Sequence, residues 1–474
     1  MTTSTYDLAV VGAGPAGMAA AAAAGDAGCR VALVDAAERP GGQFWRHPPG
    51  GIDHVRDLHH DVRTFRRLHA RVRGTVEHLP GHQVWTVTRE DDAFGLHTVR
   101  DGAEVVFRAR ALVLAPGAYD RQLPFPGWDL PGVYTAGGAQ ALLKEHQVTV
   151  GRRVVVGGTG PFLLPVAAGL AERGVNVSGV FEANSPGEWL RRGAGAVPVV
   201  RSPRKLAEGA GYAAALARHR IPYRPRHAVV AAHGTDEVTA VTVARLDRSW
   251  NELAGSRRRI RCDAVAVGWG FVPRLELPAA LGCRTRVDVD GSAVVDVDGL
   301  QRSSVPDVYV AGEATGVGGA QWAAVTGEIA GRAAAVRLGF PSSFPASAMR
   351  RRRHLRAFAT AMHAAHPVRD GWRDRLSDDT VVCRCEEVTA GAVTRAASEL
   401  GGTDVRSVKL LTRAGMGWCQ GRICGDATAG LTAAAAGVDV DPRGHLERPV
   451  AVPVPLGTLA ADPADASPRD VDVT

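Results

Sequence analysis

Residues 6–17, Tyr-Asp-Leu-Ala-Val-Val-Gly-Ala-Gly-Pro-Ala-Gly, place a glycine-rich turn directly after a short apolar run. Such a run is typical of a strand that is buried on both faces of a parallel sheet. An alanine-rich stretch, 18–27, follows the turn and predicts a helix. A second apolar run, 30–34, ends at Asp35, eighteen residues beyond Gly17. This strand–turn–helix–strand order, with an acidic residue at that distance, predicts a dinucleotide-binding unit.

Each residue type in this motif has a physical task. Glycines at 12, 14 and 17 let the backbone approach a pyrophosphate, and the helix N-terminus offers N–H groups and the positive end of its dipole. The carboxylate of Asp35 can accept a hydrogen bond from a ribose hydroxyl. The alternative is a plain glycine turn, which the position between a strand and a helix makes the weaker interpretation.

The same order of parts recurs further along the chain. A buried strand is expected at 153–156, followed by the turn Gly157–Gly160 and by a strand at 177–181 that ends at Glu182. Leu163 stands where the third glycine of the pattern would be, and a bulky residue there opposes close packing of helix on strand. The two copies suggest paired dinucleotide-binding units, the second inserted in the first. Whether the second unit binds a nucleotide or serves only as a scaffold stays open.

Shorter patterns predict the remaining strands of both units. The dipeptide Asp101-Gly102 is a strong signal for a β-hairpin. The expected strands are a meander at 83–88, 96–99 and 104–107, a strand at 111–114 leading into Ala115-Pro116-Gly117, a second meander at about 228–246, a strand at 262–267 leading into Gly268-Trp269-Gly270, and a return of the first unit near Val294 that ends with 307–310 and Ala311-Gly312-Glu313.

Four of the seven cysteines form one pattern near the C-terminal end, Cys383-x-Cys385 and, after thirty-three residues, Cys419-x4-Cys424. Structural thiols rarely pair so closely twice, so the four cysteines predict a metal centre. Glycines and arginines close to them can direct N–H groups at sulfur and offset the charge of four thiolates. The glycines are 415, 417, 421 and 425, and the arginines are 384, 413 and 422. The spacing favours a [2Fe-2S] cluster and leaves zinc as the alternative.

The other cysteines and the histidines suggest no further site. Cys29, Cys262 and Cys283 are scattered and are expected to be core thiols. His54, His59, His60 and His69 lack matching ligand partners and are expected on a solvated helix face. No catalytic residue can be assigned, because neither a Ser/His/Asp set nor a pair of acidic residues can be located.

Composition indicates an ordinary soluble globular protein. The chain has 474 residues, 45% hydrophobic and 22% charged, enough for two or three domains. It shows no apolar run of membrane-spanning length and no leader pattern in Met1–Thr5, and its clustered thiols suit a reducing compartment, so the expected location is the cytoplasm. The net charge of +7 comes almost wholly from arginine, and no aromatic residues interleave with Arg350–Arg353, which argues against a nucleic-acid partner.

Longer stretches carry a resemblance to a known family. Residues 114–133, LAPGAYDRQLPFPGWDLPGV, with Gly137-Gly138-Ala139-Gln140, resemble the large flavoprotein subunit of opine oxidases, hydrogen cyanide synthase and heteromeric proline or hydroxyproline dehydrogenases. Residues 382–389 and 412–424 are similar to that family's bacterioferritin-associated-ferredoxin-like module, which carries a [2Fe-2S] cluster. The tail segment 448–457 also resembles the family, so the likeness covers nearly the whole chain. It strengthens the iron–sulfur interpretation over zinc.

The resemblance implies FAD in the first unit and a division of the chain. Glu313 stands where such flavoproteins usually carry Asp, one methylene shorter, which puts the FAD pose in doubt. The implied FAD contacts are Gly12, Gly14, Pro15, Ala16, Gly17, Asp35, Gly42, Gln43, Ala115, Gly117, Gly312, Glu313, Gly319 and Ala320. The fold is then an α/β tandem Rossmann-like flavoprotein fold with a small helical [2Fe-2S] module. Its parts are an FAD-binding domain at 1–145 and 290–340, a second dinucleotide-binding-like domain at 146–289, a linker and basic helix at 341–377, the [2Fe-2S] module at 378–437 and a Pro/Ala/Asp-rich tail at 438–474 with a disordered end.

The resemblance also implies a function. The chain would be the electron-transferring component of a heteromeric amine or amino-acid dehydrogenase, in which a second FAD-containing subunit oxidises the C–N bond and a small ferredoxin-like subunit can join. One alternative is a free-standing NAD(P)H-dependent reductase with NAD(P) or another nucleotide in the second unit, where Glu182 would favour NADH. A remote alternative is a non-catalytic redox-sensing protein. Substrate, acceptor and stoichiometry lie beyond the sequence.

Overall fold

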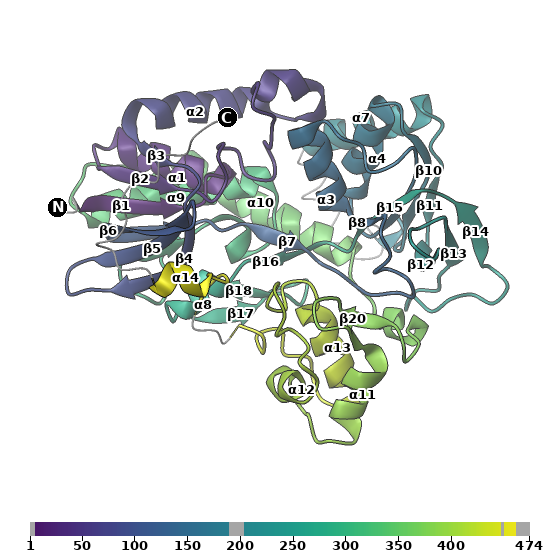
Figure 1. Cartoon of the computed structure of the whole chain (residues 1–474). Helices are drawn as coiled ribbons and strands as arrows, with labels where there is room; N and C mark the ends of the chain where they lie inside the picture. Colours follow the sequence, from purple (N-terminus) through teal and green to yellow (C-terminus); the bar gives the residue numbers. More distant parts are fainter. Residues whose placement is uncertain (1–4, 189–202, 447–449, 461–474) are drawn as a thin grey trace, which may run out of the picture.

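The computed structural model describes residues 5–188, 203–446 and 450–460, and Figure 1 shows two α/β units beside a smaller C-terminal module. The first unit is built on a seven-stranded sheet. Its strands, in spatial order, are β3 (Glu77–Leu79), β2 (Val31–Val34), β1 (Tyr6–Val11), β6 (Ala103–Leu114), β5 (Phe94–Arg100) and β4 (Gln83–Arg89), with β19 (Val308–Val310) paired to β6. Strands β1, β2, β3, β6 and β19 pair in parallel, and β4, β5 and β6 form the predicted antiparallel meander.

Strand β6 joins two parts of this sheet that the sequence suggested were separate. Residues 109–114 pair with β1 on one edge, while on the other edge 103–109 pair with β5 and 112–114 with β19. Predicting one strand at 104–107 and another at 111–114 was therefore wrong. The apolar pattern breaks at Arg108 and Arg110, which are exposed on either side of the buried Ala109 where the strand leaves the core. The predicted hairpin before β6 is confirmed, since Asp101 and Gly102 both have positive φ.

The second unit has a parallel five-stranded sheet and a small antiparallel one. The parallel order is β11 (Tyr223–Pro225), β10 (Asn176–Glu182), β9 (Arg153–Gly158), β15 (Ala264–Gly268) and β8 (Val133–Thr135). The antiparallel sheet is β12 (His227–His233), β13 (Ala240–Arg245) and β14 (Arg258–Arg261), so the predicted meander gains a third strand. Strand β8 pairs with β15, which places a stretch expected in the first domain within the second sheet. Short pairs of β7 (Ala118–Asp120) with β16 (Phe271–Pro273) link the units.

Helices cover both sheets. The first sheet carries the helices α1 (Pro15–Asp26), α2 (Val62–Thr75) and α9 (Ala320–Arg337). The second sheet carries α3 (Ala136–Ala141), α4 (Leu163–Glu172) and α7 (Pro203–Arg218), and a π-helical turn, η2 (Leu142–His146), follows α3. Two 3₁₀ turns, η1 (Ile52–Leu58) and η4 (Gly312–Thr315), precede α2 and α9. Helices α1 and α9 pack closely because a Cβ at Gly327 or Gly331 would lie 2.0–2.1 Å from carbonyl oxygens of α1. The alanine-rich sequence of α1 serves this contact.

The C-terminal module packs against the second unit. It contains β20 (Val381–Cys383), β21 (Val388–Thr389), α11 (Ala390–Ser398), α12 (Val405–Thr412) and α13 (Gly425–Ala436), preceded by η5 (Asp370–Arg375) and followed by α14 (Leu456–Ala460) near β4. Its buried apolar residues share one core with Trp250 and Trp269 of the second unit. The end of the tail, which we predicted to be disordered, lies outside the described residues. No helix among those described is long and apolar enough to cross a membrane.

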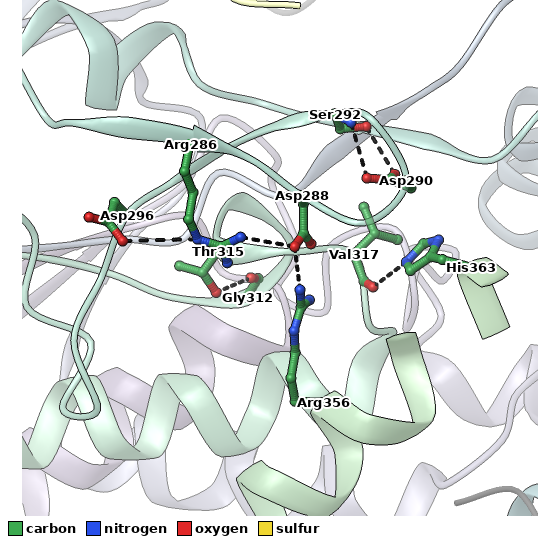
Figure 2. A network of polar contacts seen from close by, with 10 residues as sticks. All are labelled: Arg286, Asp288, Asp290, Ser292, Asp296, Gly312, Thr315, Val317, Arg356 and His363. Atoms are coloured by element: carbon green, nitrogen blue, oxygen red, sulfur yellow. Dashed lines mark hydrogen bonds and ion pairs between the residues drawn. The ribbon is translucent and has the colours of Figure 1, made fainter. Parts of the chain in front are cut away.

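The predicted basic helix is α10 (Ala346–Ala365), and ion pairs fix it to a hairpin of the first unit (Figure 2). That hairpin consists of β17 (Thr285–Val287) and β18 (Ala293–Val295). In the turn between them the Asp288 carboxylate, with 2% of its side chain exposed, pairs with Arg356 of α10 and lies 3.0 Å from Arg286 Nη1. His363 Nε2 lies 2.8 Å from the Val317 carbonyl oxygen. Helix α10 is thus held beside the loop that leads into α9. A short helix, α8 (Glu276–Ala280), precedes the hairpin in the chain and lies near it in Figure 1.

Candidate functional site

A cavity of about 1180 Å³ runs between the two units. Both glycine-rich turns line it, together with residues of α10 and of the β7 segment. Thirteen of the fourteen predicted cofactor contacts line this cavity: Gly12, Gly14, Pro15, Ala16, Asp35, Gly42, Gln43, Ala115, Gly117, Gly312, Glu313, Gly319 and Ala320. The cavity therefore brings together residues from the first fifty positions, the end of β6 and the start of α9.

The first glycine turn leaves no room for side chains. Gly12 has φ +100°, and a Cβ there would lie 2.4 Å from the Ala115 carbonyl oxygen. A Cβ on Gly42, at φ +57°, would lie 2.8 Å from the Gly14 Cα. Gly17 is the exception among the predicted contacts: it does not line the cavity, and its Cβ would lie 1.6 Å from the Gly12 carbonyl oxygen. Gly17 therefore packs α1 on the turn and does not line the cavity, while Gly12, Gly14 and Gly42 form a glycine cradle in the cavity wall.

Asp35 sits at the end of β2, where the cradle begins. Its Oδ1 accepts a hydrogen bond of 2.7 Å from the Ala37 N–H, and its Oδ2 accepts one from the Ala13 N–H of the glycine turn. Burial raises the pKa of this carboxyl above its ordinary value, and the two backbone N–H groups oppose that rise. The carboxylate thus ties β2 to the turn and keeps lone pairs for a ligand hydroxyl.

Glu313 takes a position that its extra methylene allows. Its Oε1 accepts a hydrogen bond of 2.9 Å from the Gly319 N–H, and its Oε2 lies 3.3 Å from the Gly318 nitrogen, at the N-terminus of α9. The pKa of this carboxyl is raised from 4.5 to about 7, because the effect of burial exceeds the opposing effect of the two N–H groups. The side chain therefore satisfies free N–H groups at the start of α9 and lines the cavity with a group that can change charge near neutral pH.

The second glycine turn holds a carboxylate of its own chain. Glu182, only 2% exposed, accepts hydrogen bonds from the Thr159 hydroxyl at 2.7 Å, the Gly160 N–H at 2.8 Å and the Asn184 N–H at 2.9 Å. The Asn184 amide in turn donates to the Pro367 carbonyl oxygen at 2.9 Å, behind α10. The segment after α10, at Pro367, is thereby fixed against the second glycine turn, beside Thr159 and Gly160.

The four predicted metal ligands lie together in two contacting pairs, Cys383 with Cys424 and Cys385 with Cys419. Cys383 and Cys424 are buried, whereas Cys385 is exposed and Cys419 is partly exposed. The hydrogen bond from Cys424 lowers the pKa of Cys383 to about 5, and the Gly415 N–H, 3.4 Å from Cys383 Sγ, acts in the same direction. The described residues contain no group of three or more His, Cys, Asp or Glu side chains arranged around a single ion.

Glycines make this approach of the two cysteine segments possible. A Cβ on Gly417 would lie 2.2 Å from the Cys385 Cβ. Gly415 has φ +82° and turns its N–H toward Cys383. Glycine is thus required where the loop after α12 crosses β20, as the clustered glycines of the sequence suggested.

Comparison with known proteins identifies both parts. Residues 6–329 match the pyridine nucleotide-disulphide oxidoreductase family, and residues 381–433 match the BFD-like [2Fe-2S] binding domain. Hydrogen cyanide synthase subunit HcnB of Pseudomonas aeruginosa is 34% identical over 438 residues, 88% of this chain and 90% of that protein. An opine oxidase subunit of Agrobacterium tumefaciens is 34% identical over 441 residues, 88% of this chain and 84% of that protein. The chain belongs to the pyridine nucleotide-disulphide oxidoreductase family.

Solved structures agree on the fold. The crystal structure of L-proline dehydrogenase from P. horikoshii has a TM-score of 0.69 with 21% identity, covering 97% of this chain and 80% of that one. T. acidophilum thioredoxin reductase has a TM-score of 0.50 with 21% identity, covering 70% of this chain and 98% of that one. The predicted tandem Rossmann-like architecture with a C-terminal iron–sulfur module is therefore confirmed.

This member of the pyridine nucleotide-disulphide oxidoreductase family is a flavin-dependent oxidoreductase with FAD and a [2Fe-2S] cluster. Its residues fit both groups. Gly12, Gly14 and Gly42 line the cavity beside the N-terminus of α1, and the backbone could not pack there with side chains at Gly12 and Gly42, which suits the close approach of a pyrophosphate. The cysteine spacing left a [2Fe-2S] cluster and zinc as alternatives, and the match of residues 381–433 to the BFD-like [2Fe-2S] binding domain supports the cluster.

Several residues of the site were not singled out by the sequence. Tyr119, Asp120 and Arg121 line the cavity, and burial raises the pKa values of Tyr119 and Asp120. Arg121 pairs with Asp426 of the cysteine module at 3.1 Å, and Arg422 pairs with Glu276 at 2.7 Å. These partners lie far apart in the sequence. The family-like stretch 114–133 could have drawn attention to Tyr119, Asp120 and Arg121, whereas Arg422 stood out only as a charge near the cysteines.

The remaining histidine and cysteine predictions are partly corrected. His59 is buried, with Nδ1 3.1 Å from the Phe44 carbonyl oxygen, and burial lowers its pKa to about 4, so it does not lie on a solvated face. His54 and His60 are exposed as predicted. Cys29, Cys262 and Cys283 are buried core thiols, as the sequence indicated.

Proposed function

We propose that this chain is the electron-transferring component of a heteromeric amine or amino-acid dehydrogenase of the opine or proline type. A second FAD-containing subunit would oxidise the C–N bond, and a small ferredoxin-like subunit would be a third component. Electrons would reach an acceptor through the [2Fe-2S] cluster and the FAD of this chain. Its seven cysteines are all free, which suits the cytoplasm as its location.

One observation carries the proposal: similarity extends over nearly nine-tenths of the chain to proteins named as subunits of oxidising complexes. HcnB is named as a subunit of hydrogen cyanide synthase, and the relative from Agrobacterium tumefaciens as a subunit of opine oxidase. Each alignment covers 88% of this chain and therefore extends beyond the two flavoprotein units. The proposal therefore rests on likeness over most of the length of both chains and not on the flavoprotein units alone.

Residue roles follow from the geometry of the cavity. Gly12, Gly14 and Gly42 would accept the pyrophosphate of FAD, and Asp35 a ribose hydroxyl. Cys383, Cys385, Cys419 and Cys424 would ligate the cluster. Glu313 would stand at the ribityl side, where its bonds to the N–H groups of Gly318 and Gly319 leave fewer lone pairs for the cofactor than a shorter Asp would.

A specific observation supports the rival, a free-standing NAD(P)H-dependent reductase. The cavity extends to Thr159 and Gly160, so the second glycine turn opens into the same space as the first. Against it, Glu182 already accepts the N–H of Gly160, and Leu163 is buried beneath the turn. The only cysteines of the sequence between 146 and 289 are Cys262 and Cys283, so the second unit has no Cys-x-x-Cys pair for disulfide chemistry.

An anaerobic titration of the purified chain with NADH separates these functions. We expect the flavin and iron–sulfur absorption bands to stay intact with NADH and to bleach with dithionite. Bleaching by NADH at a rate fast enough for turnover would establish the reductase instead. In a parallel assay, amino acids or opines added to the chain alone should produce no reduction, and enzyme-like oxidation by the isolated chain would disprove the need for a partner.

A further inference from the structure

One layer of side chains separates the cavity from the loop that carries Cys419 and Cys424. Tyr119 of β7 and Glu276 of α8 line the cavity, and both contact Arg422 of that loop. Arg422 Nε lies 2.8 Å from the Tyr119 hydroxyl oxygen and 2.7 Å from Glu276 Oε1. The guanidinium is nearly buried, with 12% of the side chain exposed. The cysteine loop is therefore in direct contact with the cavity wall.

Arg422 also reaches back to the predicted cluster ligands. Its Nη1 donates a hydrogen bond of 3.0 Å to the carbonyl oxygen of Cys419, and Nη2 donates one to the Ala451 carbonyl oxygen. Its guanidinium carbon lies 5.9 Å from the centre of the Tyr119 ring. One side chain thus contacts an aromatic ring of the cavity wall and the backbone of a cysteine.

A second arginine fixes the same two surfaces. Arg121 Nε donates a hydrogen bond of 3.1 Å to Asp426 Oδ2, two residues after Cys424. Its Nη2 donates to the Ser292 hydroxyl and lies 3.5 Å from Asp290 Oδ2, next to the hairpin of Figure 2. With 9% of its side chain exposed, Arg121 forms a buried clamp between the flavoprotein unit and the start of α13. Such a clamp sets the distance between the cavity and the cysteines.

We propose that Arg422 and Tyr119 are positioning residues for electron transfer within this chain, between the cluster and the FAD cavity. The inference rests on the proposed function and specifies its internal route. Two successive one-electron transfers across the wall balance one two-electron change of the flavin. Each transfer changes the oxidation state of the cluster once, and the electrons come from the C–N bond that the partner oxidises.

The charge of Arg422 has a second consequence. The positive charge of a guanidinium favours the form of the cluster that carries one more electron. Glu276 offsets part of that charge on the cavity side. Removing the guanidinium should therefore make the cluster harder to reduce, whereas lysine should retain the charge but lose the planar fork that bridges four partners.

The test uses the purified full chain with both cofactors, without amine substrate and without a partner. A photochemical one-electron reductant is pulsed under anaerobic conditions, and the redistribution of electrons between cluster and flavin bands is timed. The cluster potential is measured separately by a redox titration followed by EPR. The variants are Arg422→Gln, Arg422→Lys and Tyr119→Phe, each checked for iron and flavin content. Arg443→Gln is the control, because Arg443 pairs with Asp441 at 2.9 Å, has half of its side chain exposed and does not line the cavity.

Each of the four variants has an expected result. Arg422→Gln lowers the cluster potential and slows redistribution on the order of tenfold, the factor that corresponds to losing an interaction of about 1.4 kcal/mol. Arg422→Lys keeps the potential near the wild-type value but is slowed, and Tyr119→Phe is slowed with full cofactor content. Arg443→Gln redistributes electrons at the wild-type rate.

Wild-type redistribution in Tyr119→Phe and Arg422→Lys, with both cofactors bound, would overturn the proposed route even if Arg422→Gln fails to fold. Slowing of the Arg443 control by the same factor would also overturn it, because the effect would then not depend on the cavity wall. A failure of the proposed function appears elsewhere, as reduction by NADH or amine oxidation by the isolated chain, and leaves these rates unchanged.

Discussion

At the scale of single residues, two glycines of the first unit differ in what a methyl group would meet. A Cβ on Gly17 would lie 1.6 Å from the Gly12 carbonyl oxygen, and both atoms belong to a packed backbone. We expect Gly17→Ala to destabilise the chain by about 3 kcal/mol or more and to release FAD, since the turn must move. Thermal unfolding and flavin content measure this.

The control for that substitution lies in α2. Gly74 is a helical glycine with nothing within 4 Å of its ideal Cβ. Gly74→Ala should stabilise the chain by about 0.5 to 1 kcal/mol, because alanine lowers the entropy of the unfolded chain at no steric cost. Equal effects of the two substitutions would show that Gly17 has no packing role.

Glu313 gives a prediction about pH. Its pKa rises from 4.5 to about 7 in the folded chain, so the unfolded chain loses its proton first as the pH increases. The contribution of this group to stability is therefore complete below about pH 4.5 and is lost as the pH rises to about 7. Relative to Glu313→Gln, the wild type should lose about 3 kcal/mol across this window. Parallel pH profiles of thermal unfolding for the two proteins would contradict the shift.

Local patterns explain which residues the sequence could identify. The cavity residues Gly12, Asp35 and Glu313 follow predicted strands, and the ends of parallel strands meet at one edge of a sheet. Gly17 was placed on the pyrophosphate because a one-dimensional pattern does not tell a ligand contact from a helix–turn contact. Arg422 drew attention only as a charge near cysteines, since its partner Tyr119 lies 303 positions away.

At the scale of elements, the ends of strands were harder to predict than their existence. Strand β6 is continuous through Arg108–Arg110 because its pairing with β1 begins at Ala109, where its pairing with β5 ends. Strand β8 went unassigned because three residues, Val133–Thr135, carry no periodic signal, and their parallel partner β15 lies in a distant part of the chain. Pairing between distant segments decides such elements, and it leaves no mark in local composition.

Helix α10 offers a prediction at this scale. Asp288 is nearly buried and pairs with Arg286 on its own hairpin and Arg356 on the helix (Figure 2). Asp288→Asn should cost about 2 to 3 kcal/mol, because it removes the carboxylate that pairs with Arg356 and leaves Arg286 only its 3.9 Å contact with Asp296. Arg353→Gln, on an exposed position of α10, should change stability by less than about 0.5 kcal/mol. Denaturant titration of both variants tests this, and equal stabilities would mean that the pair does not anchor the helix.

At the scale of the whole molecule, the two cofactor parts have separate cores and a shared wall. The first sheet is covered by α1, α2 and α9, while the cysteine module shares its core with the second unit. Ion pairs between Arg121 and Asp426 and between Arg422 and Glu276 connect the module to the cavity. Each cofactor part should therefore keep its own ligand when the other is lost.

A pair of cysteine substitutions tests this separation. Cys385 belongs to the exposed side of the four cysteines, so Cys385→Ser should abolish the [2Fe-2S] signal in EPR and lower the iron content, yet retain FAD and nearly the wild-type unfolding temperature. Cys29 is buried against the first sheet, so Cys29→Ser should keep iron and flavin but cost about 1 to 2 kcal/mol for burying a hydroxyl. Loss of FAD from Cys385→Ser would mean that the cluster supports the cavity, and the two parts would then form a single folding unit.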